Sequence, residues 1–142
     1  MCFVKDPNFK KHFVALEDIV CYKVLLKDDV PEYYRAPYFP FLYAVGKVFK
    51  HDINLDYMDN VDKLKGGVFH SYINLEIGRT KWVMAWGECF HYGFILQPRL
   101  CKCVIPKGSI CWANDTEYAS STIKVLEEVE PFETVELKLK EI

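Results

Sequence analysis

Apolar and polar side chains alternate with a period of two in several stretches of this chain, which is the pattern of half-buried strands. In IVCYKVLL, residues 19–26, β-branched and apolar residues predict a strand that places positions 20, 22, 24 and 26 on one face. In TVELKLKEI, residues 134–142, the alternation predicts a strand with one face on a core and the other in water. Further strands are expected within residues 41–49, 68–73, 100–105, 110–113 and 121–129.

One helix is predicted in the middle of the chain, and a second remains open. Asn74 can act as an N-cap, because its side-chain oxygen can accept a hydrogen bond from the first turn. Trp82 and Trp86 fall near one helical face, and Gly87 is expected to end the helix.

Proline and glycine mark the connections between these elements. Three prolines between residues 31 and 40 exclude a helix there and argue against a central strand, so we expect a structured loop. Pro106 and Gly108 predict a tight turn that starts at Ile105. Together the elements predict an α+β fold of mostly antiparallel strands with one or two helices, in a single domain spanning residues 1–142.

Composition and charge narrow the classes of function. The formal net charge is −2, and the basic residues form no stripe, so binding of duplex nucleic acid is not expected. No run of about 18 apolar residues predicts a membrane span, and no secretory signal follows a basic start. We therefore expect a cytoplasmic protein whose six cysteines are reduced thiols. Aromatic residues make up 15%, which suits an aromatic core or a binding surface that uses rings.

Cysteine and histidine spacing leaves a zinc site open but does not assign one. Cys89 and His91, and likewise Cys101 and Cys103, are separated by one residue and would share a strand face. Zinc ligands in structural sites are more often two to four residues apart, and cysteine is also a common buried residue. Neither a metal nor a cofactor is therefore part of the expected site.

Six residues are candidates for contacts with a ligand: Tyr34, Arg35, Phe90, His91, Asn114 and Tyr118. Arg35 lies among tyrosines in the proline-rich loop, where a guanidinium could bind phosphate and rings could stack on a base. Each group also has a purely structural explanation. Arg35 could pack on a tyrosine at the surface, the rings could belong to a core or an interface, and Asn114 could stabilise a turn.

Four short motifs resemble a family of small proteins carried by phages and their bacterial hosts: CYKVL at 21–25, YYRAPYFPF at 33–41, GGVFHSYINLE at 66–76, and CVIPKGS…YASSTIKVLEEV between 103 and 129. Within that group, the length and motif order are similar to phage Thoeris anti-defence proteins of the signal-sponge type. The resemblance implies a homo-oligomer that sequesters a cyclic ADP-ribose-type messenger without catalysis, in the host cytoplasm. It also implies that Arg35, Phe90 and Asn114 hold phosphates and adenine.

Two other functions remain as alternatives. Tyr22, Ser71 and a later carboxylate, Glu117 or Glu127, faintly resemble the arrangement of ADP-ribosyltransferases, in which a glutamate orients the ribose of NAD. The third possibility is a phage accessory domain that binds another protein. Among these alternatives, the non-enzymatic messenger-binding protein is the expected function.

Overall fold

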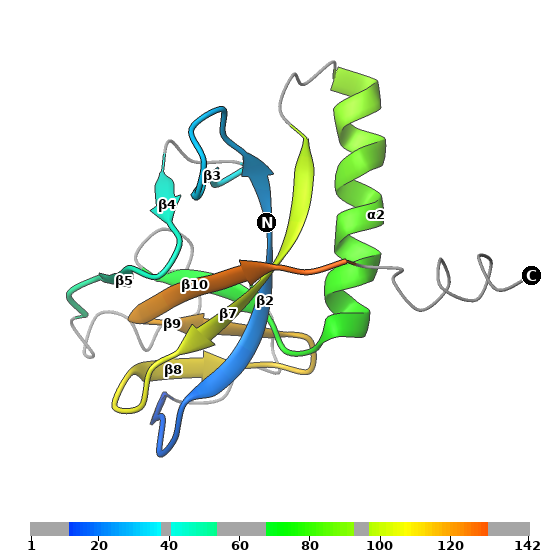
Figure 1. Ribbon diagram of the computed structural model, residues 1–142. Helices are drawn as coiled ribbons and strands as arrows, with labels where there is room; N and C mark the ends of the chain where they lie inside the picture. Colours follow the sequence, from blue (N-terminus) through cyan, green and yellow to red (C-terminus); the bar gives the residue numbers. More distant parts are fainter. Residues whose placement is uncertain (1–11, 38–40, 54–67, 93–96, 131–142) are drawn as a thin grey trace, which may run out of the picture.

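The computed structural model describes residues 12–37, 41–53, 68–92 and 97–130 of the chain (Figure 1). Within these ranges the chain forms a 10-stranded sheet in which the paired strands run antiparallel, together with a single helix. The predicted α+β class with mostly antiparallel strands is thereby confirmed. The strand predicted at residues 134–142 lies outside the described residues.

The elements carry the labels of Figure 1. They are β1 (Phe13–Val14), β2 (Ile19–Lys27), β3 (Tyr33–Arg35), β4 (Leu42–Ala44), β5 (Val48–Lys50), β6 (Phe69–Tyr72), α2 (Leu75–Tyr92), β7 (Pro98–Ile105), β8 (Ile110–Ala113), β9 (Glu117–Ser120) and β10 (Thr122–Glu128). The strand order is β1-β8-β9-β6-β2-β7-β10-β5, with β3 paired to β2 and β4 to β3.

The sheet curls back on itself because β9 and β10 are one stretch of chain, interrupted only at Ser121. The first half of this stretch pairs with β6, and the second half pairs with β7. Strand β2 in turn pairs with both β6 and β7. The path β9–β6–β2–β7–β10 therefore ends on the segment where it began, and it encloses an inner surface.

The core lies on this inner surface. Cys21, Cys103 and Val125 form one row across β2, β7 and β10, and each of them is fully buried. Ile105 and Ile123 are likewise fully buried in the same cluster. The fully buried residues of β2 thus have odd numbers. The even-numbered residues share one face, as predicted, and that face points outward, because successive strand residues point to opposite sides.

Helix α2 packs on the outside of β2 and β7 (Figure 1). Asn74 is its N-cap as predicted, since its Oδ1 accepts a hydrogen bond from the Ile77 N–H at 2.9 Å. At Gly78 the helix approaches the sheet closely, where an added Cβ would lie 3.0 Å from Leu100 Cδ1 and 3.3 Å from the Tyr22 Cβ. A glycine inside the helix therefore permits the contact with the sheet.

The helix ends later than predicted, which corrects the role given to Gly87. α2 continues through Gly87 to Tyr92. A glycine ends a helix most readily when it adopts a left-handed backbone conformation, and Gly87 is not among the residues with positive φ. None of the helices in the described part of the chain has the length and apolar character that crossing a membrane would require.

The strands at 19–26, 68–73, 100–105, 110–113 and 121–129 are confirmed as β2, β6, β7, β8 and β10. The interval 41–49 divides into β4 and β5 around Gly46, whose φ is 84°. Two short strands differ from expectation: β3 lies in the proline-rich segment, and β9 lies in the polar bend after β8. The turn after β7 also lies one residue later than predicted, since the Ser109 N–H bonds the Pro106 carbonyl.

Candidate functional site

Arg35 is held at the surface by an ion pair. Its Nε lies 2.5 Å from Asp28 Oδ2, and its side chain is 58% exposed. Asp28 also accepts a hydrogen bond from the Val30 N–H at 3.0 Å. That backbone bond, followed by the bond from Arg35, lowers the pKa of the Asp28 carboxyl below its usual range. The guanidinium therefore helps to fix the β2–β3 turn, while much of its surface stays accessible.

Tyr34 points the opposite way, into the interior. It is 4% exposed, and its hydroxyl donates a hydrogen bond to Glu128 Oε2 over 2.8 Å. Burial, followed by this bond to Glu128, raises the pKa of the Tyr34 hydroxyl above its usual value. Successive residues of β3 thus face opposite sides, so Tyr34 and Arg35 do not share one surface.

Asn114 and Tyr118 serve the β8–β9 hairpin. The Asn114 Oδ1 accepts hydrogen bonds from the N–H groups of Thr116 at 2.9 Å and Glu117 at 2.7 Å, which is the turn chemistry of asparagine. Tyr118 is half-buried on the inner surface, where it packs against the core. Desolvation, followed by the proximity of Cys21 and Cys111, raises the pKa of Tyr118.

The structure does not bring the predicted residues into one place. Arg35 pairs with Leu26 near the end of β2. Asn114 lies in the turn between β8 and β9, and β9 is two strands away from β2. The end of β9 next to this turn is level with Tyr22, four residues before Leu26. The side chains of Phe90 and His91 lie outside the described residues. A site that joins Arg35 to Asn114 is therefore not formed by the described part of the chain.

A different set of polar residues gathers at one end of the inner surface, which we call the polar end. It consists of Lys23, Lys27, Tyr34, Tyr43, Arg99 and Glu128. Lys23, Cys101 and Glu128 form a row across β2, β7 and β10, directly beside the buried row of Cys21, Cys103 and Val125. The Lys23 ammonium donates a hydrogen bond to the His70 carbonyl and lies 5.4 Å from the centre of the Tyr43 ring.

An irregularity in β10 places Glu128 at the polar end. The register shifts between Val125 and Glu127, so Glu128 rather than Glu127 stands opposite Cys101. A bulge of this kind changes which side chain faces the interior. Glu128 is 27% exposed and lies 3.2 Å from Arg99. Glu127, by contrast, is exposed.

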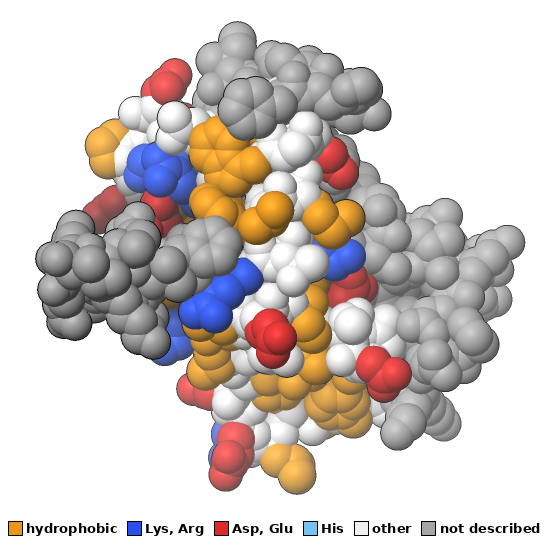
Figure 2. Space-filling view, turned by 90° about the vertical axis from the view of Figure 1, so that its right-hand side faces the viewer, with side chains coloured by type: hydrophobic (Ala, Val, Ile, Leu, Met, Phe, Trp, Pro, Cys, Tyr) orange, Lys and Arg blue, Asp and Glu red, His pale blue; other side chains and the backbone are white. Residues whose placement is uncertain are grey.

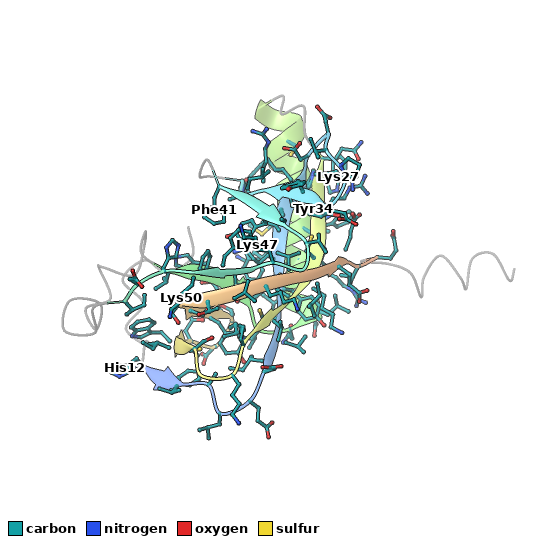
Figure 3. The ribbon with its side chains drawn as sticks, turned by 60° about the vertical axis from the view of Figure 1, so that its left-hand side comes forward. His12, Lys27, Tyr34, Phe41, Lys47 and Lys50 are labelled. Atoms are coloured by element: carbon teal, nitrogen blue, oxygen red, sulfur yellow. The ribbon has the colours of Figure 1, made fainter. Side chains whose placement is uncertain are left out.

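Aromatic rings lie against the two lysines of the polar end. Lys27, Tyr34 and Tyr43 form a row across β2, β3 and β4, with the Lys27 ammonium 5.1 Å from the Tyr34 ring centre. The Tyr43 ring contacts the Phe49 ring at 5.5 Å, and Lys47 lies 5.3 Å from that ring. Figure 3 shows Lys27 next to Tyr34, with Lys47 below them in that view. Lysines over rings gain a cation–π attraction of about 0.5–1 kcal/mol at exposed sites.

The cysteines of the inner surface are poor nucleophiles. Burial raises the pKa of Cys21 to about 11 and the pKa values of Cys101 and Cys111 to about 12, so these thiols stay protonated near neutral pH. Burial also raises the pKa of Cys103 well above its usual value. Within the described ranges, no group of three or more histidine, cysteine, aspartate or glutamate residues is arranged to hold a metal ion.

The residues of the transferase alternative separate between two faces of the sheet. Tyr22, Tyr72 and Glu117 form a row across β2, β6 and β9. Tyr22 in this row packs beneath Gly78 of α2. Ser71 points to the inner surface instead, where it is buried near Cys21. An NAD molecule could not reach Tyr22 and Ser71 from one side of the sheet.

The sequence carried a signal for the polar end that the motif search missed. In β2, Lys23 and Lys27 occupy the same face as Cys21 and Leu25, because the four residues lie at alternate positions of the strand. A lysine on the buried face of a strand is unusual and marks a position with polar partners. Glu128 carried no such signal, since its direction depends on the bulge. Comparisons with protein families, curated proteins and solved structures gave no match to this chain.

Proposed function

We propose that the protein binds a small anionic ligand that carries an aromatic base, a nucleotide, and does not transform it chemically. The observation that supports this most directly is the composition of the polar end. Three of its six residues are cations, Lys23, Lys27 and Arg99, and they stand against the single carboxylate of Glu128. A local excess of positive charge in a chain of net charge −2 favours an anionic guest.

The rings beside these cations supply the second part of nucleotide recognition. Tyr34 and Tyr43 are buried and held across β3 and β4, so their positions are fixed before a ligand arrives. Phosphate oxygens would bind the ammonium groups and the guanidinium, and the base would pack against the partly exposed Phe49 ring, which contacts Tyr43. Because the binding groups are already in place, little ordering is required, which favours tight binding.

The chemistry of the site supports binding rather than catalysis. The nearest thiol, Cys101, is kept protonated by burial, as described above. Glu128 accepts the Tyr34 hydroxyl bond through Oε2 and pairs with Arg99 through Oε1, so both of its oxygens already have partners within the protein. The resemblance to signal-sponge proteins narrows the proposal to sequestration of a cyclic ADP-ribose-type messenger during phage counter-defence.

Calorimetric titration with cyclic ADP-ribose isomers, ADP-ribose, NAD and AMP tests the proposal. We expect at least one of these nucleotides to bind, and to be recovered unchanged after heat denaturation of the protein. Lys27→Ala should weaken that binding at least tenfold, which is about 1.4 kcal/mol. Loss of binding above about 0.5 M salt would agree with a charge-based site.

Lys124→Ala is the matched control. Lys124 lies between the buried residues Ile123 and Val125 on β10, so its side chain points away from the inner surface. It should leave nucleotide affinity unchanged. If no nucleotide binds, the proposal is wrong. If a nucleotide binds but Arg35→Ala and not Lys27→Ala weakens it, the ligand lies on the outer side of the β3–β4 hairpin. Release of nicotinamide from NAD would instead support the transferase.

A further inference from the structure

The face of α2 that points away from the sheet carries no charged side chain between Thr80 and Gly87, and Val83 and Met84 give it an apolar centre. Thr80, Val83, Met84 and Gly87 are all exposed, and they follow the spacing i, i+3, i+4 and i+7 that places residues on one helical stripe. Val83 is 51% exposed and Met84 is 53% exposed. Figure 2 views the molecule from the side on which α2 lies in Figure 1, and it shows apolar side chains gathered on this side. We call these four residues the α2 stripe.

The ends of the α2 stripe allow close approach of another helix. Thr80 and Gly87 are small, and an added Cβ at Gly87 would meet no atom within 4 Å. Small residues around larger apolar ones let two helix backbones come near each other while the larger side chains interlock. The stripe itself contains no charged residue, so its burial requires no desolvation of a charge.

Charges beside the stripe indicate which helix would fit. Lys81 and Glu88 lie on the same flank of the α2 stripe, seven residues apart, and they carry opposite charges. Lys81 is three residues before Met84, and Glu88 is four residues after it. A two-fold axis near Met84 would therefore place a second α2 antiparallel to the first. Lys81 of one helix would then lie beside Glu88 of the other, with an offset along the helix axis of about one residue, or about 1.5 Å.

The opposite orientation is less favourable. In a parallel pair, the flank with Lys81 would face the other flank of the second helix, where Arg79 lies. Two cations would then stand close together, and like charges at such positions destabilise a helix pair. The antiparallel pairing is also self-complementary, as a two-fold interface must be, because Thr80 meets Gly87 and Val83 meets Met84.

We propose that α2 docks on α2 of a second copy of this chain, in an antiparallel and two-fold symmetric dimer centred near Met84. The inference depends on the α2 stripe and its flanking charges, and not on the nucleotide proposal. A single helix pair makes a small interface, so we expect dissociation in the micromolar range.

Multi-angle light scattering on the full chain, between about 1 and 200 µM, tests this pairing because it spans the expected dissociation constant. The wild type should change from monomer to dimer over this range. Val83→Glu should remain monomeric throughout while keeping its circular dichroism spectrum, because Val83 is exposed on the folded chain. Leu16→Glu is the control: Leu16 is 83% exposed but lies far from α2 in sequence, and this variant should dimerise like the wild type.

Charge reversal tests the orientation. Lys81→Glu should weaken the dimer about tenfold, Glu88→Lys should do the same, and the double variant should recover wild-type association, because each pair is then restored across the two-fold axis. A wild type that stays monomeric at about 200 µM would contradict the proposal, and so would a dimer that Val83→Glu leaves intact. A double variant weaker than both single variants would overturn the antiparallel arrangement.

Discussion

The two ends of the inner surface differ in character although the same strands build both. At one end, Cys21, Cys103 and Val125 are fully buried in a row. In the adjacent row, two residues further along β2, Lys23 and Glu128 flank Cys101. The first row stabilises the fold through burial of apolar surface. The second can exist only because Tyr34 and other polar groups supply hydrogen bonds to the charges.

The difference between the buried row and the polar end indicates which part of the inner surface a ligand could reach. A fully buried row offers no access to a ligand, and its thiols are held in the neutral form. The half-exposed residues of the polar end keep contact with water, so a ligand can exchange with the water there. Three experiments would break or sharpen this comparison.

Alkaline pH should cause the largest loss of stability, because it acts on the thiols of the apolar row. An unfolded cysteine has a pKa near 8.5, whereas burial raises the pKa of Cys21 to about 11. Because the unfolded chain loses its thiol protons first, the free energy of unfolding should fall as the pH rises above about 8.5. Each buried thiol should contribute about 1 kcal/mol of this loss at about pH 9.5.

Urea denaturation at about pH 7.5 and pH 9.5 measures this effect. Cys21→Ala serves as the control, since it removes one titrating thiol and should make the dependence on pH shallower. A free energy of unfolding that is constant over this interval would show that the thiols are not shielded from ionisation in the folded protein.

Ile123→Ala should have the next largest effect, a loss of about 3 kcal/mol, because it leaves a cavity among fully buried neighbours. Lys124→Ala, at the adjacent and outward-facing position, should change the free energy of unfolding by less than about 0.5 kcal/mol. Denaturant titrations of both variants give the two values. Similar losses in the two variants would mean that β10 does not distinguish an inner from an outer face.

Tyr34→Phe should have the smallest effect, about 1 kcal/mol, because it removes one hydrogen bond to a partly exposed carboxylate and keeps the ring. Glu128→Gln, which retains an acceptor for the hydroxyl but loses the charge, provides the comparison. If Tyr34→Phe were more damaging than Ile123→Ala, the polar end rather than the apolar row would be the main source of stability.

The fold was predictable where one physical effect dominated locally. Apolar, β-branched runs such as residues 19–26 gave the long strands, and Asn74 gave the start of the helix. Strand β9 was not predictable in this way, because its four residues contain no apolar run and its strand conformation depends on pairing with β6, which is distant in sequence. The helix end was missed because Gly87, although a weak helix former, is tolerated inside α2.

The candidate site was less accessible to sequence reasoning. Proline, tyrosine and arginine in one loop drew attention to Arg35, but strand alternation in β3 turned Tyr34 inward and left Arg35 with Asp28. Asn114 was correctly recognised as a possible turn residue, and its oxygen does bond the N–H groups of that turn. Contacts between distant strands, such as Tyr34 with Glu128, depend on register and cannot be inferred from local spacing.

The extra residue in β10 has a consequence for how this protein could change over time. Because Leu126 is the residue that shifts the register, a strand that kept regular pairing past Val125 would place Leu126 opposite Lys102 and Glu127 opposite Cys101. Substitutions that favour or remove this bulge, without touching either glutamate, would then select which carboxylate faces the lysines, so related chains that differ in the bulge would be expected to differ in what they bind.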